Sequence, residues 1–90
     1  MTLQGINLTG IGISYLQQKL KSKISCIYNI KFGHDSKTFE NYCLFNLRDR
    51  EIVNITIPDM MKDVSPHRIV YELEEFLYFT FKENYPEYFI

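Results

Sequence analysis

Two stretches of alternating apolar side chains, separated by four turn-forming residues, constrain the fold of this chain more than any other feature. Every second residue is apolar in ISCIYNIKF (24–32) and over most of KTFENYCLFNL (37–47), which is the period of a strand with one buried face. Gly-His-Asp-Ser at 33–36 favours a turn between them. We therefore predict an antiparallel hairpin. Its inward side chains are Ile24, Cys26, Tyr28, Ile30 and Phe32 on the first strand, and Phe39, Cys43, Phe45 and Leu47 on the second.

A loop at 33–36 also predicts the register of this hairpin. The predicted facing pairs are Phe32 with Lys37, Ile30 with Phe39, Cys26 with Cys43, and Ile24 with Phe45. The two apolar faces coincide in this register, which supports it. Two facing cysteines are either a disulfide or redox pair, or two small buried apolar residues in a reducing cytosol. They lack the close paired spacing of a zinc site.

A third strand follows the hairpin. RDR (48–50) favours a turn, and EIVNITI (51–57) alternates again until Pro58 ends the strand. The inward residues of this strand are Val53, Ile55 and Ile57. We therefore predict a three-stranded antiparallel meander.

The residues before the hairpin predict a short amphipathic helix that starts at about residue 12. Its apolar face carries Ile13, Leu16 and Leu20, at helical spacing. A chain of 90 residues is one domain. We divide it into an irregular lead at 1–11, a globular core at 12–84 and an aromatic tail at 85–90.

A longer helix is predicted after the third strand. Residues 59–63 favour a loose turn, Ser65 is the predicted N-cap, and Pro66 is the predicted first helical residue. This helix continues to about Asn84, before the break at Pro86. The predicted order is therefore α-β-β-β-α, an α+β fold in which the meander is packed by an N-terminal helix and a longer C-terminal helix.

The last twenty residues hold eight Phe and Tyr rings, which is more than one face of a helix can bury. The face that can cover the sheet consists of Ile69, Val70, Leu73, Phe76, Leu77, Thr80 and Phe81. The remaining rings lie on the opposite side, at the edge, or after the helix, and exposed rings usually mark interaction surfaces. We therefore predict a partner-binding surface formed by Tyr71, Glu74, Glu75, Tyr78, Phe79, Lys82, Tyr85, Tyr88 and Phe89.

The sheet carries a similar surplus. If both helices cover one face, Ile27, Tyr42, Leu44 and Ile52 remain on the other and form a candidate second interface. Alternatively, the tail at 85–90 folds back over that face and buries these side chains.

Charge and motif content favour a protein-binding function over an enzymatic one. The net charge is −1, but residues 59–90 hold three Lys or Arg against seven Asp or Glu, a balance of 3 − 7 = −4. This acidic and aromatic surface suits a basic patch on a partner. Adjacent His34, Asp35 and Ser36 cannot converge as a catalytic triad. We expect a non-enzymatic accessory or inhibitor-type protein that binds a protein partner or itself as a homodimer, with no cofactor and no metal.

Composition and the N-terminal segment bear on origin and location. The chain has no Ala and is rich in residues with AT-rich codons, which fits low-GC bacteria, their phages and other mobile elements. No signal-peptide pattern is present at the N-terminus. No run of about 18 apolar residues exists. We expect a cytoplasmic protein that does not enter the membrane.

A basic patch provides an alternative, a nucleic-acid-binding module. The patch consists of Lys19, Lys21, Lys23 and Lys31, with Gln17 and Gln18. With the α-β-β-β-α order, ISYLQQKLKSK and GHDSKTF resemble the first helix and the first hairpin loop of the double-stranded-RNA-binding domain family. The resemblance spans about residues 12–82. It implies RNA contacts by Gln17, His34 and lysines at the start of the last helix, where this chain has DVSPHR.

Overall fold

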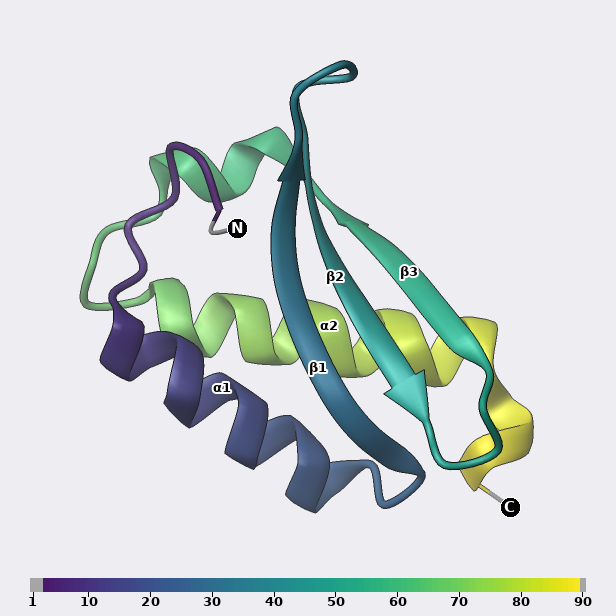
Figure 1. The fold of residues 1–90 in the computed structure, drawn as a ribbon. Coiled ribbons are helices and arrows are strands. Elements are labelled where there is room, and N and C mark those ends of the chain that lie inside the picture. Colours follow the sequence, from purple (N-terminus) through teal and green to yellow (C-terminus); the bar gives the residue numbers. More distant parts are fainter. Residues whose placement is uncertain (1–2, 90) are drawn as a thin grey trace.

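A three-stranded antiparallel sheet in the order β1-β2-β3 forms the centre of the fold (Figure 1). The computed structural model describes residues 3–89. Its elements are α1 (Gly10–Lys23), β1 (Ile27–Asp35), β2 (Glu40–Leu47), β3 (Ile52–Ile57), the 3₁₀ helix η1 (Asp59–Asp63), α2 (Ile69–Asn84) and the 3₁₀ helix η2 (Pro86–Phe89). The predicted α+β class, the order α-β-β-β-α and the two flanking helices are confirmed.

Both helices pack on one face of the sheet, and α2 passes behind the strands in the view of Figure 1. The alternation of β2 and β3 supplies the sheet side of the core, and the inward residues predicted for β3 are buried. At the centre, the Phe45 and Phe81 rings meet edge to face with centroids 5.4 Å apart. The fully buried helix residues are Leu16, Leu20, Ile69, Leu73, Leu77 and Phe81. Each such side chain contributes roughly 1.5–3 kcal/mol by leaving water.

α1 begins at Gly10, slightly earlier than predicted, because Thr9 caps it. The Thr9 Oγ1 accepts a hydrogen bond of 3.1 Å from the Gly12 N–H. Gly12 also allows α1 to approach α2, since a Cβ there would lie 2.8 Å from the Leu8 side chain and 3.2 Å from that of Val70. The first turn of α1 is therefore fixed by both a cap and a close helix contact.

The β1–β2 hairpin forms, but its turn lies three residues later than predicted. β1 continues to Asp35, and the loop occupies residues 36–39. The Asp35 side chain accepts hydrogen bonds from the main-chain N–H groups of Lys37 and Thr38, a local bond that favours a turn at this point. Phe39, predicted to point inward, instead lies exposed in the loop with a positive φ of 62°.

The longer strand changes every facing pair of the hairpin. Asp35 faces Glu40, and the predicted pairing of Cys26 with Cys43 is wrong, as are the other three predicted pairs. Cys43 faces Phe32 and is buried, whereas Cys26 precedes β1. Burial raises the pKa of the Cys43 thiol far above its ordinary value, and both cysteines are free thiols.

A bulge near the start of β1 changes which side chains face the core. The register shifts between Ile27 and Asn29, and the extra residue breaks the alternation of the strand. Ile27 is consequently 1% exposed, whereas Tyr28 is 65% exposed. The predictions that Tyr28 points inward and that Ile27 lies on the uncovered face are therefore wrong. Ile24 is buried as predicted, but as the C-cap of α1.

The start of α2 also differs from the prediction. The Ser65 carbonyl accepts hydrogen bonds from the N–H groups of Arg68 and Ile69, each of 3.0 Å. A turn at 66–68 therefore precedes the helix, and Arg68 rather than Ser65 is the N-cap residue. Residues 59–63, predicted as a loose turn, form η1.

The tail closes the end of the core beside α2 and the β2–β3 turn (Figure 1). The ring centroids of Tyr85, Tyr88 and Phe89 lie 5.5, 6.0 and 5.9 Å from that of the buried Phe81. The Tyr88 hydroxyl donates a hydrogen bond of 2.7 Å to Asp49 in that turn. The alternative in which the tail covers the second face of the sheet is therefore wrong.

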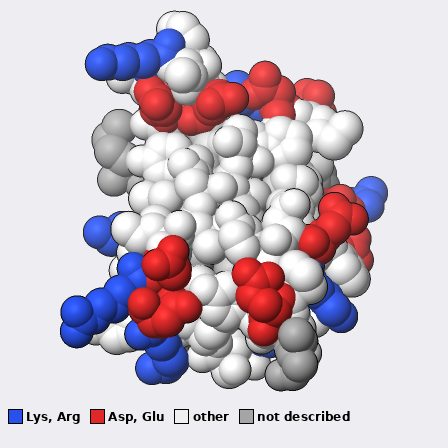
Figure 2. Space-filling model, turned by 90° about the vertical axis from the view of Figure 1, so that its right-hand side faces the viewer, with Lys and Arg blue, Asp and Glu red and all other residues white. Residues whose placement is uncertain are grey.

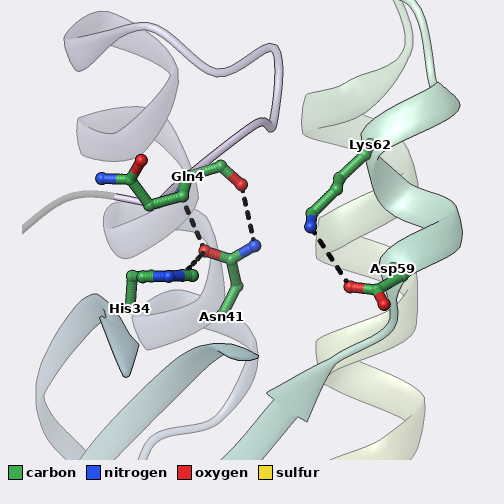
Figure 3. A network of polar contacts seen from close by, with 5 residues as sticks. All are labelled: Gln4, His34, Asn41, Asp59 and Lys62. Carbon is green, nitrogen blue, oxygen red and sulfur yellow. Dashed lines mark hydrogen bonds and ion pairs between the residues drawn. The ribbon is translucent and has the colours of Figure 1, made fainter. Parts of the chain in front are cut away.

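The lead is irregular over residues 3–9, and a buried amide attaches it to β2 (Figure 3). Residues 1–2 of the predicted lead at 1–11 and residue 90 of the predicted tail lie outside the described residues. Asn41, only 2% exposed, accepts a hydrogen bond of 2.7 Å from the Gln4 N–H and donates one of 2.9 Å to the Gln4 carbonyl. These two bonds fix the orientation of the amide. Its oxygen therefore faces His34 Nδ1 at 3.1 Å, so Nδ1 carries the hydrogen.

Candidate protein-interaction surface

α2 exposes three side chains at four-residue intervals on its outer side. Tyr71 and Phe79 are 66% and 56% exposed, and Glu75 between them is also exposed. Side chains four residues apart are neighbours on a helix, so the two rings and the carboxylate form a continuous stripe. We call Tyr71, Glu75 and Phe79 the α2 stripe.

An open pocket of about 300 Å³ lies between the α2 stripe and the end of α1. Its wall contains an ion pair between the helices, since Lys23 Nζ lies 2.7 Å from a carboxylate oxygen of the buried Glu74. The hydrogen bond to Glu74 raises the pKa of Lys23, and the ammonium group lies 4.9 Å from the centre of the Tyr78 ring. Glu75 forms no ion pair within residues 3–89, so its charge faces solvent.

A second open pocket, of about 330 Å³, lies between the N-terminal ends of the two helices. It is lined by Thr9, Ile11, Gly12, Tyr15, His67, Val70 and Tyr71. Ile11 is 85% exposed and Tyr15 is also exposed, so α1 adds apolar surface to the α2 stripe. Tyr71 lines both pockets and joins them into one surface.

Sequence reasoning did not single out Ile11 or Tyr15. Ile11 fell in the segment predicted as an irregular lead, because the Thr9 cap was not recognised as the start of α1. Tyr15 lies one position before the buried Leu16. The spacing of Ile11 and Tyr15, four residues apart on one helix, was the available signal.

The structure divides the predicted partner-binding residues into two groups. The exposed group is Tyr71, Glu75, Phe79 and Lys82. The buried or half-buried group is Glu74, Tyr78, Tyr85, Tyr88 and Phe89. In this second group, Tyr78 packs against the rings of Phe79 and Phe89, and Lys82 Nζ lies 5.8 Å from the Tyr78 ring centre. Of this second group, Tyr78 contacts the α2 stripe through Phe79 and Glu74 lines the first pocket, whereas Tyr85 and Tyr88 pack on the buried Phe81.

In the candidate second interface, Ile52 is 64% exposed, as expected, but the other three residues are less exposed than expected. Tyr42 and Leu44 lie on the uncovered face of the sheet, and both are half-buried. The Tyr42 ring lies over Gly33, where a Cβ would come within 2.5 Å of the ring. Tyr42 thus shields the main chain of β1, and Ile27 belongs to the core.

Three of the five candidate nucleic-acid contacts are engaged within the chain. Gln17 Nε2 donates a hydrogen bond of 2.9 Å to the Ile30 carbonyl. Lys23 pairs with Glu74, and His34 contacts Asn41 (Figure 3). Lys19 and Lys21 are exposed. Near the start of α2, Lys62 pairs with Asp59 and Arg68 with Glu72. Gln17 and Lys23 of the patch are therefore occupied by contacts within the chain, whereas Lys19 and Lys21 are exposed.

Comparison of the chain with models of protein families, with curated proteins and with solved structures found no match. Across residues 3–89, no helix has the length and apolar character needed to cross a membrane. Within the same residues, no three His, Cys, Asp or Glu side chains lie together in a way that could hold a metal ion.

Proposed function

We propose that this chain is a small protein-interaction module that binds another protein through the outer face of its two helices. The contact surface consists of the α2 stripe together with Ile11 and Tyr15. The position of Tyr71 carries this proposal, because its exposed ring lines both pockets. Contiguous exposed aromatic and aliphatic side chains of this kind are typical of interaction surfaces.

The chemistry of the surface indicates the kind of segment it binds. The pocket beside Ile11 and Tyr15 suits an apolar side chain, because Tyr and aliphatic carbons line most of it. Glu75, without an ion-pair partner in the described residues, suits a Lys or Arg of the partner. The partner segment therefore presents an apolar residue next to a basic one. An accessory or inhibitor role in a phage or mobile element would use this same surface.

Selection of binding peptides from a random library tests the proposal. Peptides selected on the wild-type protein should combine apolar and basic residues. They should bind the Tyr71→Ala/Phe79→Ala variant at least about tenfold more weakly, since central aromatic residues dominate such contacts. Glu75→Gln should reduce the salt dependence of binding, because it removes the charge that attracts the basic residue.

A matched control removes two equally exposed rings elsewhere. Tyr28 and Phe39 are 65% and 71% exposed and lie on β1 and in the β1–β2 loop. The Tyr28→Ala/Phe39→Ala variant should bind the selected peptides as the wild type does. Peptides that bind the Tyr71→Ala/Phe79→Ala variant with unchanged affinity would place the contact surface elsewhere and contradict the proposal.

A further inference from the structure

β3 is one of the two edge strands of the sheet, and it carries no charged side chain. The strand Ile52–Ile57 reads IVNITI, and no other strand of residues 3–89 pairs with it on the side away from β2. Free strand edges are usually protected by Lys, Pro, a bulge or a covering segment, because they otherwise pair with other chains. Between Ile52 and Ile57 the strand has no Lys, no Pro and no bulge, and Ile52, Asn54 and Thr56 are exposed.

The hydrogen bonds of the β2–β3 turn show which main-chain groups point to this edge. Leu47 N–H donates to the Glu51 carbonyl at 2.9 Å. In an antiparallel ladder, hydrogen-bonded pairs alternate with non-bonded pairs. Because Phe45 faces Val53 in the same register, Val53 and Ile55 bond to β2. The N–H and C=O groups of Ile52, Asn54 and Thr56 therefore point to the free edge.

The opposite edge of the sheet, on β1, is protected. β1 carries a bulge between Ile27 and Asn29, and the exposed Lys31 lies in its middle. Gln17 of α1 donates a hydrogen bond of 2.9 Å to the Ile30 carbonyl, which occupies an acceptor on that edge. Because the β1 edge is protected and the β3 edge is not, we expect the β3 edge to pair with another strand.

We infer that two copies of this chain pair along β3 in antiparallel orientation, so that one sheet continues through both copies. A two-fold axis at Asn54 places Asn54 opposite its own copy and Ile52 opposite Thr56 of the other. Each facing pair then forms two main-chain hydrogen bonds, in which the outward N–H of each residue donates to the outward C=O of the other. No like charges meet along the strand, and the two Asn54 amides face each other on the uncovered side of the sheet.

The surroundings of β3 fit a second copy of the chain. Figure 2 shows the side of the molecule on which β3 is outermost; its centre is largely uncharged, and carboxylates lie around the margin. Arg50, with a φ of 74°, and Pro58, which lacks an N–H, limit the edge at its two ends. Asn54 lies midway between Arg50 and Pro58, so the pairing between the two copies is centred on it. This self-association does not depend on the helix surface.

The oligomeric state tests this inference. Light scattering on the wild type, over a concentration series up to about 1 mM, should show the mass rising from 10.8 kDa towards twice that value. Asn54→Lys places two like charges face to face and should weaken the dimer roughly tenfold or more. An equimolar mixture of Asn54→Lys and Asn54→Asp chains should restore it, because the facing charges are then opposite.

The control variant is Asn46→Lys, which puts the same charge on β2, in the middle of the sheet and away from the edge. It should dimerise as the wild type does. A wild-type protein that stays monomeric throughout, an Asn54→Lys chain that dimerises normally, or a mixture that does not recover would each overturn the inference. Tyr71→Ala/Phe79→Ala should leave the dimer unchanged, which separates this test from that of the helix surface.

Discussion

The Tyr88 hydroxyl donates a hydrogen bond of 2.7 Å to the Asp49 carboxylate, across 39 residues of sequence. The bond joins the tail to the β2–β3 turn, where Asp49 also accepts a hydrogen bond from the Glu51 N–H. Together these two bonds hold the pKa of Asp49 below its ordinary value, and the bond to Asp49 raises the pKa of Tyr88 to about 12. The tail is thus attached by a pH-sensitive bond as well as by ring packing.

Tyr88→Phe should lower the free energy of unfolding over a defined pH range. Because the folded-state pKa of Asp49 is lowered, its contribution is present above the ordinary value of 3.8 and is lost as the pH falls through the folded value. Because the pKa of Tyr88 is raised, its contribution is present below 10.0 and is lost as the pH rises towards about 12. Urea unfolding should therefore show a constant difference between the two proteins from about pH 5 to 9, which shrinks on either side. A difference independent of pH would contradict this account.

Two rings on α2, two residues apart, should differ sharply in their effect on stability. Phe81→Ala should lower the free energy of unfolding by about 3–5 kcal/mol, because it empties a fully buried site. Phe79→Ala should change it by no more than about 0.5 kcal/mol, because Phe79 is mostly exposed. Urea unfolding of both variants measures this. A large loss in Phe79→Ala would mean that this ring serves the fold.

The buried amide of Asn41 should be important for holding the lead. Asn41→Ala removes the partner of both main-chain groups of Gln4 and should cost about 1–3 kcal/mol. Amide hydrogen exchange at Gln4 should become faster. Asn46→Ala, on the outer side of the same strand, is the control and should cost much less. Unchanged exchange at Gln4 in Asn41→Ala would show that other contacts hold the lead.

Gly33 and Tyr42 should show strong energetic coupling. Gly33→Ala adds a Cβ that would lie 2.5 Å from the Tyr42 ring, so the ring must move, at a cost of about 1 kcal/mol or more. In a Tyr42→Thr background the same substitution should be neutral or slightly stabilising, since Gly is unfavourable within a strand. A double-mutant cycle measures the difference. Additive effects of the two substitutions would contradict the contact.

The order and type of the elements follow from the periodicity of the sequence, but the register of the first hairpin does not. The alternation in β2 and β3 is uninterrupted, so their inward residues could be predicted. In β1 the bulge at Ile27 breaks the alternation, and no residue type there signals it. The predicted β1–β2 turn was placed too early because Gly33 was taken as a turn residue. In the structure Gly33 lies within β1, where the absence of a Cβ leaves room for the Tyr42 ring.

Only part of the candidate site could be predicted, because periodicity describes the residues of a single helix or strand. Helical periodicity placed Tyr71 and Glu75 opposite the core face and Phe79 at its edge, and the structure exposes all three side chains. Periodicity ends with the helix, however, so it could not show that Tyr88 and Phe89 turn back onto Phe81. The contribution of α1 depends on how the two helices pack, which a pattern within one segment does not contain.

The most direct test of the proposed interaction surface is a titration of the isotope-labelled protein with a selected peptide, followed by amide chemical shifts. The account predicts that the largest shifts cluster at Tyr71, Glu75 and Phe79 and extend to Ile11 and Tyr15. Shifts that cluster instead on the uncovered face of the sheet, or around the lysines of α1, would contradict it.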